Sequence, residues 1–157
     1  MKIIYKTDKE EMKTLFIDRD GTINKDCPYC HNPSDLFIYP DAVDLLQRYQ
    51  DDGFRIIIVT NQSGIGRGYF TESQFKEFSD FMNDKLKENG IVISAIYYCP
   101  HKPEDSCNCR KPETGLFSEV LEDYKVDIPS SIVVGDRNEI DGEFARRIKL
   151  PFRLLRH

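Results

Sequence analysis

Leu15-Phe16-Ile17-Asp18-Arg19-Asp20-Gly21-Thr22 is the stretch that organises the chain. Its apolar run stops at two aspartates one residue apart, and Gly21-Thr22 then favours a turn. This order predicts a buried strand that delivers two carboxylates to one edge of a sheet, where ligands of open α/β sheets bind. Two like charges so close together are costly unless a cation lies between them or one holds a proton. We therefore expect a magnesium-dependent reaction with Asp18 as the nucleophile.

Strand and helix patterns alternate along the chain. Apolar runs predict strands at 13–18, 54–59, 91–98 and 131–134, with short edge strands at 1–5, where a loose tail is the alternative, and at 151–155. Helical patterns separate them, at 41–52 with Asp41 as N-cap, at 71–88 with Thr71 as N-cap, at 115–124 and at 139–148. The alternation predicts an α/β fold, a Rossmann-like parallel sheet with helices on both faces. Because no linker or repeat interrupts it, we expect a single domain over residues 1–157.

The composition is that of an ordinary globular protein, with 39% hydrophobic and 31% charged residues and a net charge of −5. An acidic balance disfavours a nucleic-acid partner without excluding one, because a local basic patch can be hidden in the total. Residues 1–11 lack the apolar core of a signal peptide, and no run approaches transmembrane length. We therefore expect a cytoplasmic protein without a membrane partner.

Three carboxylates are expected at the same edge of the sheet. Asp18 and Asp20 follow the first central strand, and Asp136 follows the strand at 131–134. The carboxylate of Asp18 can attack phosphorus and form an acyl phosphate. Asp20 can protonate the leaving alcohol and later take a proton from water. We predict Asp18 and Asp20 as catalytic residues and Asp18, Asp20 and Asp136 as Mg²⁺ ligands, since Mg²⁺ prefers hard oxygens. For a lone aspartate at a strand end, a helix N-cap would be the alternative.

Two further loops carry side chains that suit a phosphate group. Thr60 and Asn61 follow the strand at 54–59 and offer a hydroxyl and an amide, and Lys111 offers a compact cation. Phosphoryl transfer depends above all on positioning and charge neutralisation. Taken alone, Thr60-Asn61 is a turn and Arg110-Lys111-Pro112 is a solvated basic spot. Beside the aspartates, they predict a phosphate-binding role.

A cluster of cysteines near position 100 suggests a second metal. Cys99, His101, Cys107 and Cys109 offer three sulfurs and one imidazole. Four such ligands are the number that a closed tetrahedral zinc site needs. A closed site has no position for water, so zinc would be structural: it would pin a proline-rich loop and present Arg110 and Lys111 to the substrate. A redox-active or incidental group of thiols is the alternative.

The other two cysteines lie in Cys27-x-x-Cys30-His31, inside the long connection from 22 to 40. Such a long connection in a compact domain is usually functional. The motif could bind a metal or respond to oxidation, but we expect two unremarkable thiols.

These motifs resemble the haloacid dehalogenase (HAD) superfamily of aspartyl phosphatases. The match runs in the expected order, through Asp18-x-Asp20-Gly21-Thr22, Thr60-Asn61, Lys111 and Gly135-Asp136. Within the superfamily, Cys109-Arg110-Lys111-Pro112, the loop 60–68 and Tyr29-x-His31 resemble the small, minimally capped D-glycero-D-manno-heptose 1,7-bisphosphate phosphatases. The related histidinol-phosphate phosphatases share the zinc loop.

The resemblance implies a Rossmann-like, HAD-like fold with a minimal cap and a zinc-stapled loop, and a requirement for Mg²⁺. It implies an aspartyl-phosphate intermediate, with Asp18 as nucleophile and Asp20 as acid and base. It places Thr60 and Lys111 on the transferring phosphate. Arg110, with the loops 22–40 and 61–68, would select the leaving group.

The resemblance is incomplete after Gly135-Asp136. Family members carry a second aspartate a few residues later, but Ile140 stands at the commonest spacing, so either Asp141 or Glu139 would complete the magnesium site. Other segments resemble the phosphatase domain of polynucleotide kinase/3′-phosphatases, which lack the zinc loop. We therefore expect hydrolysis of a small phosphorylated metabolite such as a heptose bisphosphate. The alternatives are histidinol phosphate, a polynucleotide 3′-phosphate, or a zinc-stapled binding module without catalysis.

Overall fold

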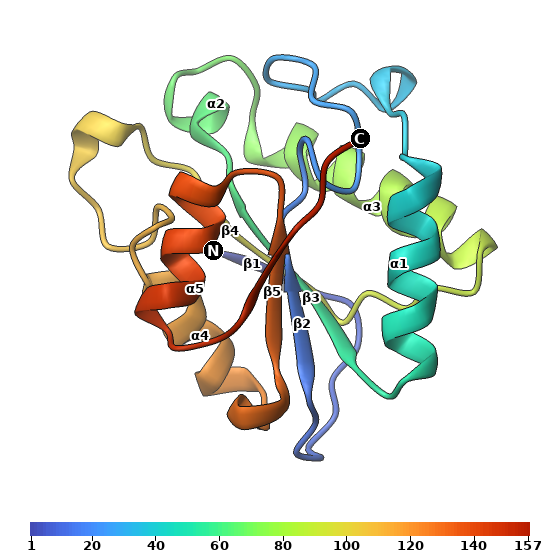
Figure 1. Ribbon diagram of the computed structural model, residues 1–157. Helices are drawn as coiled ribbons and strands as arrows, with labels where there is room; N and C mark the ends of the chain where they lie inside the picture. The colour runs from blue at the N-terminus through green and yellow to red at the C-terminus, as the bar shows by residue number, and fades with distance from the viewer.

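A six-stranded sheet forms the centre of the computed structural model, which describes residues 1–157 (Figure 1). The strands are β1 (Lys2–Ile4), β2 (Thr14–Ile17), β3 (Arg55–Asn61), β4 (Ala95–Cys99), β5 (Ile132–Gly135) and β6 (Phe152–Leu154). Their order across the sheet is β1-β4-β3-β2-β5-β6. β1 is antiparallel to β4, and all other neighbours are parallel. The predicted α/β fold is confirmed, with the strand near the N-terminus at one edge.

Helices cover both faces of the sheet. They are α1 (Pro40–Asp51), α2 (Ser63–Gly66), α3 (Glu72–Glu88), α4 (Gly115–Asp123) and α5 (Glu143–Arg147), with 3₁₀ turns η1 (Pro33–Asp35), η2 (Pro103–Asp105) and η3 (Ile128–Ser130) and a π-helical turn η4 (Asn138–Gly142). α1 and α3 lie on one face, and α4 and α5 on the other (Figure 1). None of the helices combines the length and apolar character needed to span a bilayer. A cytoplasmic location stays a prediction.

The apolar runs of the strands supply a core on each face. In β2, Leu15 and Ile17 pack toward α1 and α3, whereas Phe16 packs toward α4 and α5. Each core contains 16 buried residues. Residues 55–60 of β3 are all buried, as expected for a central strand that is covered on both faces. Burial of each large apolar side chain contributes about 1.5–3 kcal/mol, so the two cores hold the sheet edge that carries the site.

Some predicted boundaries were wrong. α1 begins at Pro40 with Tyr39 as its N-cap, so Asp41 lies in the first turn. The fixed φ and missing N–H of a proline suit the first helical position, which explains this start. The strand predicted from residue 91 begins only at Ala95. The main-chain N–H of Val92 donates to the side-chain oxygen of Gln50, at 2.7 Å, and is therefore not available to a neighbouring strand. The helix predicted over 139–148 is divided into η4 and α5.

Four parallel strands bring their carboxyl ends to one edge of the sheet. β2 ends just before Asp18, β3 ends in Thr60-Asn61, and β5 ends just before Asp136. β4 ends at Cys99 beside Asn61, at the start of the cysteine loop. The loop after β2 and the segment around α2 lie together above this edge, at the top of Figure 1. The convergence expected from strand polarity is therefore present in the fold.

Candidate active site and cysteine cluster

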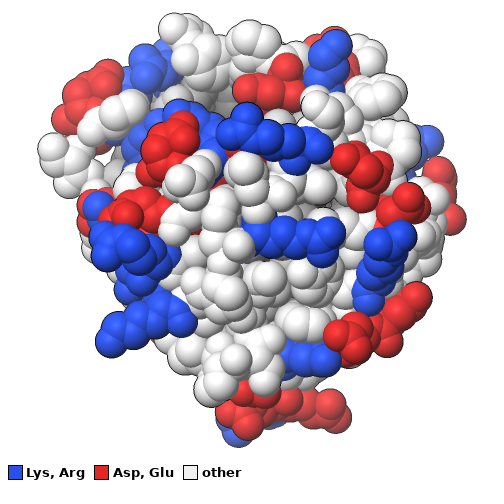
Figure 2. All heavy atoms as spheres, in the orientation of Figure 1, with Lys and Arg blue, Asp and Glu red and all other residues white.

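A cavity of about 370 Å³ opens at this edge of the sheet. It is lined by all the residues predicted for the reaction, namely Asp18, Asp20, Thr60, Asn61, Arg110, Lys111 and Asp136. It is also lined by Asp26, Pro28, Tyr29 and Gln62, which belong to the loops 22–40 and 61–68 that were expected to select the leaving group. Arg137 and Ile140, for which no role was predicted, line it as well. On the face drawn in Figure 2, basic and acidic side chains are interspersed and do not merge into one broad basic surface.

Three carboxylates meet at the floor of this cavity. One oxygen each from Asp18, Asp136 and Asp141 lies within 4.8 Å of the others. Asp141 is 2% exposed, whereas Glu139 points to solvent and pairs with Arg137 at 3.1 Å. Of the two residues that sequence reasoning left open, the structure therefore places Asp141 in the group.

Two glycines make room for this cluster. A Cβ on Gly135 would collide with the side chain of Asp141, and one on Gly21 would come within 2.5 Å of a carboxylate oxygen of Asp136. Gly21 also has a φ of +85°, which L-residues rarely adopt. The close approach of the carboxylates thus explains why a glycine stands in the Gly-Thr pair and in the Gly-Asp pair of the sequence. Thr22 then donates its hydroxyl to Asp136, at 2.9 Å.

Lys111 is the cation of the cluster. Its ammonium donates to Asp18 at 2.9 Å and to Asp141 at 2.8 Å, and the side chain is 2% exposed. Burial opposes the charge of Lys111, but the two carboxylates outweigh it and raise the pKa of the ammonium. Burial also raises the pKa of Asp18, to about 8, because Lys111 offsets only part of the burial and of the repulsion from Asp141 and Asp136.

The charge balance of the cluster suits a divalent cation. Three clustered carboxylates, of which only Asp18 and Asp141 pair with the Lys111 ammonium, carry two more negative charges than positive ones when all three are ionised, which is costly without a counter-ion. Carboxylate oxygens are the ligands that Mg²⁺ prefers. The residues present therefore fit the predicted metal, with Asp141 added to the set.

Asp20 is held apart from this cluster. Arg19 donates to both of its oxygens, at 2.9 and 3.0 Å, Gln62 donates at 2.9 Å and Asn24 at 3.1 Å. Burial by itself raises the pKa of Asp20, but the charge and hydrogen bonds of Arg19, followed by Gln62 and Asn24, outweigh it and lower the pKa. These contacts thus favour the carboxylate form of Asp20. Its role as a magnesium ligand stays a prediction, since its carboxylate is not among the three that cluster.

The side chains of Thr60 and Asn61 have different hydrogen-bond partners. The Thr60 hydroxyl is buried and accepts a hydrogen bond from Gln62 at 3.0 Å. The Asn61 amide is paired with the main chain of Lys111 in both directions, at 3.1 and 2.8 Å. Asn61 therefore ties the end of β3 to the cysteine loop and orients the main chain of Lys111. It also lines the cavity, and its role in phosphate binding stays a prediction.

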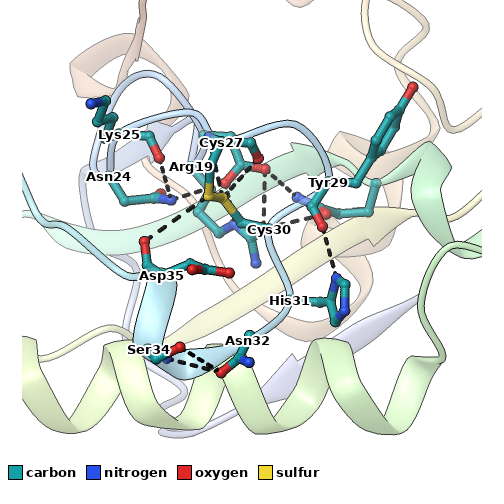
Figure 3. The surroundings of a disulfide bond; sticks show 12 residues. Arg19, Asn24, Lys25, Cys27, Tyr29, Cys30, His31, Asn32, Ser34 and Asp35 are labelled. Carbon is teal, nitrogen blue, oxygen red and sulfur yellow. Dashed lines mark hydrogen bonds and ion pairs between the residues drawn. A yellow bond between two sulfur atoms is a disulfide. The ribbon is translucent and has the colours of Figure 1, made fainter.

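Cys27 and Cys30 form a disulfide, so the expectation of two unremarkable thiols was wrong (Figure 3). A turn brings the residues together: the N–H of Cys30 donates to the carbonyl of Cys27 at 2.9 Å, and the Cα atoms are 5.3 Å apart, a separation that a disulfide can bridge. Spacing alone did not reveal this, because it does not specify the turn. Tyr29, inside the ring, has a φ of 59°.

The loop that contains this disulfide borders the cavity. Pro28 and Tyr29 line it, and the ring of Tyr29 packs edge-on against Tyr69 at 4.6 Å. His31 stacks on Phe70 at 5.2 Å. These contacts join the loop after β2 to the segment after α2 beside the cavity. That the two segments act as a minimal cap stays a prediction.

The second cysteine cluster brings together four side chains that could bind a metal ion. One ligating atom each from Cys99, His101, Cys107 and Cys109 lies within 4.8 Å of the others. The sulfur of Cys99 is 3.5 Å from that of Cys107, and the sulfurs of Cys107 and Cys109 are 3.8 Å apart. A tetrahedron with zinc–sulfur bonds of about 2.3 Å has edges of about 3.8 Å. The three thiols are free and form no disulfide, and the residues therefore fit zinc.

The cysteine cluster is joined to the active site through the main chain. The N–H of Gln62 donates to the carbonyl of Cys99 at 2.8 Å, and that of Gly66 donates to Pro100 at 2.9 Å. Cys109 directly precedes Arg110 and Lys111. Arg110 and Lys111 both line the cavity, and the predicted role of zinc in holding them there stays a prediction.

A family model described as polynucleotide kinase 3 phosphatase matches residues 13–154 of the chain. The chain belongs to this family of HAD phosphatases. A relative from Thermoplasma acidophilum, described as a probable D-glycero-D-manno-heptose-1,7-bisphosphate 7-phosphatase, is 54% identical over 157 residues, which are 100% of this chain and 98% of the relative. The D-glycero-beta-D-manno-heptose-1,7-bisphosphate 7-phosphatase of Haemophilus ducreyi is 42% identical over 134 residues, covering 81% of this chain and 74% of that protein.

A solved HAD phosphatase has the same fold. The D,D-heptose 1,7-bisphosphate phosphatase of B. bronchiseptica, complexed with magnesium and phosphate, superposes with a TM-score of 0.83 at 32% identity, over 91% of this chain and 80% of that one. The predicted superfamily and enzyme class are therefore confirmed. The chain is a phosphatase, a phosphoric monoester hydrolase, and the alternative of a binding module without catalysis is set aside.

Proposed function

We propose that this phosphatase hydrolyses a sugar bisphosphate of the D-glycero-D-manno-heptose 1,7-bisphosphate type, with Mg²⁺ at Asp18, Asp136 and Asp141. The observation that carries the proposal is the cluster of three carboxylates with the buried Lys111 in the cavity. Support for the substrate comes from the full-length relative at 54% identity and its described activity. When bound, Mg²⁺ would neutralise negative charge on the phosphate and bring it close to Asp18.

The chain's own residues can divide the reaction into two displacements at phosphorus. A carboxylate oxygen of Asp18 attacks the phosphorus, the bond from phosphorus to the sugar oxygen breaks, and Asp20 in its protonated form gives the alcohol its proton. Asp20, now a carboxylate, takes a proton from the water that attacks the aspartyl phosphate, which releases phosphate and regenerates Asp18. The four hydrogen bonds to Asp20 favour its carboxylate form, so this arrangement serves the second step directly.

Basic residues at the cavity wall support a substrate with a second negative group. Arg110 lines the cavity, and its Nη1 is buried without a hydrogen-bond partner, so one donor is free for a ligand. Arg137 lines the same cavity and is largely exposed. A bisphosphate offers one phosphate to Lys111 and Thr60 and a second to these guanidinium groups, which bind phosphate in a bidentate manner.

The substrate is tested by comparing three phosphate esters in the presence of Mg²⁺. We expect kcat/KM for D-glycero-D-manno-heptose 1,7-bisphosphate to exceed that for histidinol phosphate and for a 3′-phosphorylated oligonucleotide by at least about 10-fold, since the guanidinium groups have no second phosphate to bind in histidinol phosphate. Oligonucleotide hydrolysis that is faster and falls steeply with salt would contradict the proposal, because it would require a basic track along the surface.

Zinc is proposed for Cys99, His101, Cys107 and Cys109. Protein purified without chelator should contain about one zinc per chain. Replacing Cys107 by serine is expected to remove the zinc and to lower Tm by about 5–10 °C, since the loop has little core of its own. The matched control is the pair Cys27→Ser and Cys30→Ser, which should keep the zinc. Metal-free protein with an unchanged Tm would refute a structural zinc.

A further inference from the structure

We infer that Arg19 is a positioning residue of the active site: its guanidinium orients the carboxylate of Asp20 for proton transfer. This inference rests on the proposed role of Asp20 in the reaction. Nε of Arg19 donates to one oxygen of Asp20 at 2.9 Å, and Nη2 donates to the other at 3.0 Å. Two parallel hydrogen bonds between planar groups define the plane of the carboxylate as well as its position.

The burial of Arg19 is the observation that calls for a functional explanation. The side chain is 0% exposed, and its Nη1 is buried without a hydrogen-bond partner. Removing a guanidinium from water costs several kcal/mol, and a buried pair is often less stable than apolar side chains of similar volume. An apolar residue at position 19 would therefore serve the core at least as well. An apolar residue would not supply the two hydrogen bonds that hold the carboxylate of Asp20.

Aromatic rings hold the guanidinium in place. Its central carbon lies 4.7 Å from the ring centre of Phe78 and 5.3 Å from that of Phe75, both on α3. Cation–π contacts of this kind restrict the plane of the group. Figure 3 draws Arg19 among the residues that surround the Cys27–Cys30 disulfide, in the loop that borders the cavity. Arg19 thus reaches Asp20 from a rigid, water-excluded place.

Gln62 links Arg19 and Asp20 to Thr60, the residue predicted to bind phosphate. Its carbonyl oxygen accepts from Nη2 of Arg19 at 3.3 Å, and its amide donates to Asp20 at 2.9 Å and to Thr60 at 3.0 Å. The positions of the proton-transfer group and of the phosphate-binding hydroxyl are therefore coupled through Arg19 and Gln62. Neither residue was singled out by its spacing in the sequence.

The chain contains a matched control for the structural effect of a buried arginine. Arg55 is 3% exposed, pairs with Asp8 and lies 4.8 Å from the ring centre of Tyr124. It begins β3 and therefore lies at the edge of the sheet opposite the cavity. Arg55 shares the burial, the ion pair and the aromatic contact of Arg19 but touches no residue of the site.

The test is a double-mutant cycle in the full chain with Mg²⁺, read as kcat and KM for phosphate release from the heptose bisphosphate and from 4-nitrophenyl phosphate. We expect Asp20→Asn to lower kcat by about 10²–10⁴-fold. Arg19→Met, whose side chain can pack on the same rings, should lower kcat by about 10–100-fold, with KM within about threefold. The double variant should have the kcat of Asp20→Asn alone, because Arg19 acts through Asp20. Arg55→Met should keep kcat, whatever its effect on Tm.

Several outcomes would overturn the inference. One is a wild-type kcat for Arg19→Met, and another is losses that multiply in the double variant, as expected for general damage to the fold. A wild-type kcat for Asp20→Asn overturns the proton-transfer role of Asp20 and the inference together. If 4-nitrophenyl phosphate is hydrolysed but the heptose bisphosphate is not, only the proposed substrate is rejected. If Arg19→Met does not fold, Arg19→Lys replaces it; this variant keeps the charge without the paired bonds, and an unchanged kcat would again overturn the inference.

Discussion

Replacing Asp18 by asparagine is expected to reduce phosphate release by at least about 10⁴-fold, because an amide of the same shape cannot form the aspartyl phosphate. The fold should tolerate the change. Asp18 is one of three clustered carboxylates, and burial together with its neighbours already raises its pKa to about 8, so the charge is unfavourable in the absence of a metal ion. We expect Tm measured without Mg²⁺ to stay constant or to rise. Turnover is measured as inorganic phosphate released with Mg²⁺ present.

The matched control for Asp18→Asn is Asp44→Asn, on the exposed side of α1, which makes the same chemical change away from the cavity. It should keep the wild-type kcat and KM. Asp18→Ala is a useful second variant, since an asparagine can deamidate back to aspartate and simulate residual activity. Activity within about 10-fold of the wild type in both Asp18 variants would exclude an aspartyl-phosphate mechanism at this residue.

Replacing Asp141 by asparagine is expected to weaken the response to Mg²⁺ by about 10–100-fold, with a corresponding loss of activity at a fixed, low concentration of the metal. Asp141 is buried in the carboxylate cluster and pairs with Lys111 at 2.8 Å. The change therefore removes a negative charge from the place where a divalent cation fits best. The measurements are the Mg²⁺ concentration at half-maximal activity and, independently of activity, the rise in Tm on addition of Mg²⁺.

Glu139→Gln is the control that distinguishes the two residues left open by the sequence. Glu139 is exposed and pairs with Arg137 at the surface, so its loss should change the Mg²⁺ response by less than about twofold. The reverse result, a strong effect of Glu139→Gln and a weak effect of Asp141→Asn, would show that the π-helical turn has another conformation when the metal is bound.

Strand ends carried most of the information about the site. The apolar runs before Asp18, Thr60 and Asp136 are local patterns, and the carboxyl ends of parallel strands share one edge of a sheet. The approximate place of each side chain could therefore be predicted without knowing any distance. The same holds for the cysteine cluster, because short spacing alone keeps Cys107 and Cys109 near His101.

Side-chain directions could not be obtained in this way. The pairing of the Asn61 amide with the main chain of Lys111, fifty residues further along the chain, was not foreseen from the sequence, and its predicted contact with phosphate stays a prediction. No role was predicted for Arg19, and Gln62 was included only in the loop 61–68 that was expected to select the leaving group. A residue between two aspartates and a residue in a polar loop have no preferred partner until the loops pack together. The boundary of α1 was missed for a local reason, since Pro40 begins the helix more favourably than Asp41 caps it.

The sequence by itself determined the α/β alternation, the edge at which the aspartates gather and the four residues of the cysteine cluster. These follow from the hydrophobic period and from short spacings, which act over a few residues. Only the tertiary structure decided that Asp141 rather than Glu139 joins Asp18 and Asp136, that Cys27 pairs with Cys30, and that Arg19 grips Asp20. Each of these depends on a turn geometry or a rotamer that is selected when separate segments pack, and the free energy of that packing is not contained in any one stretch.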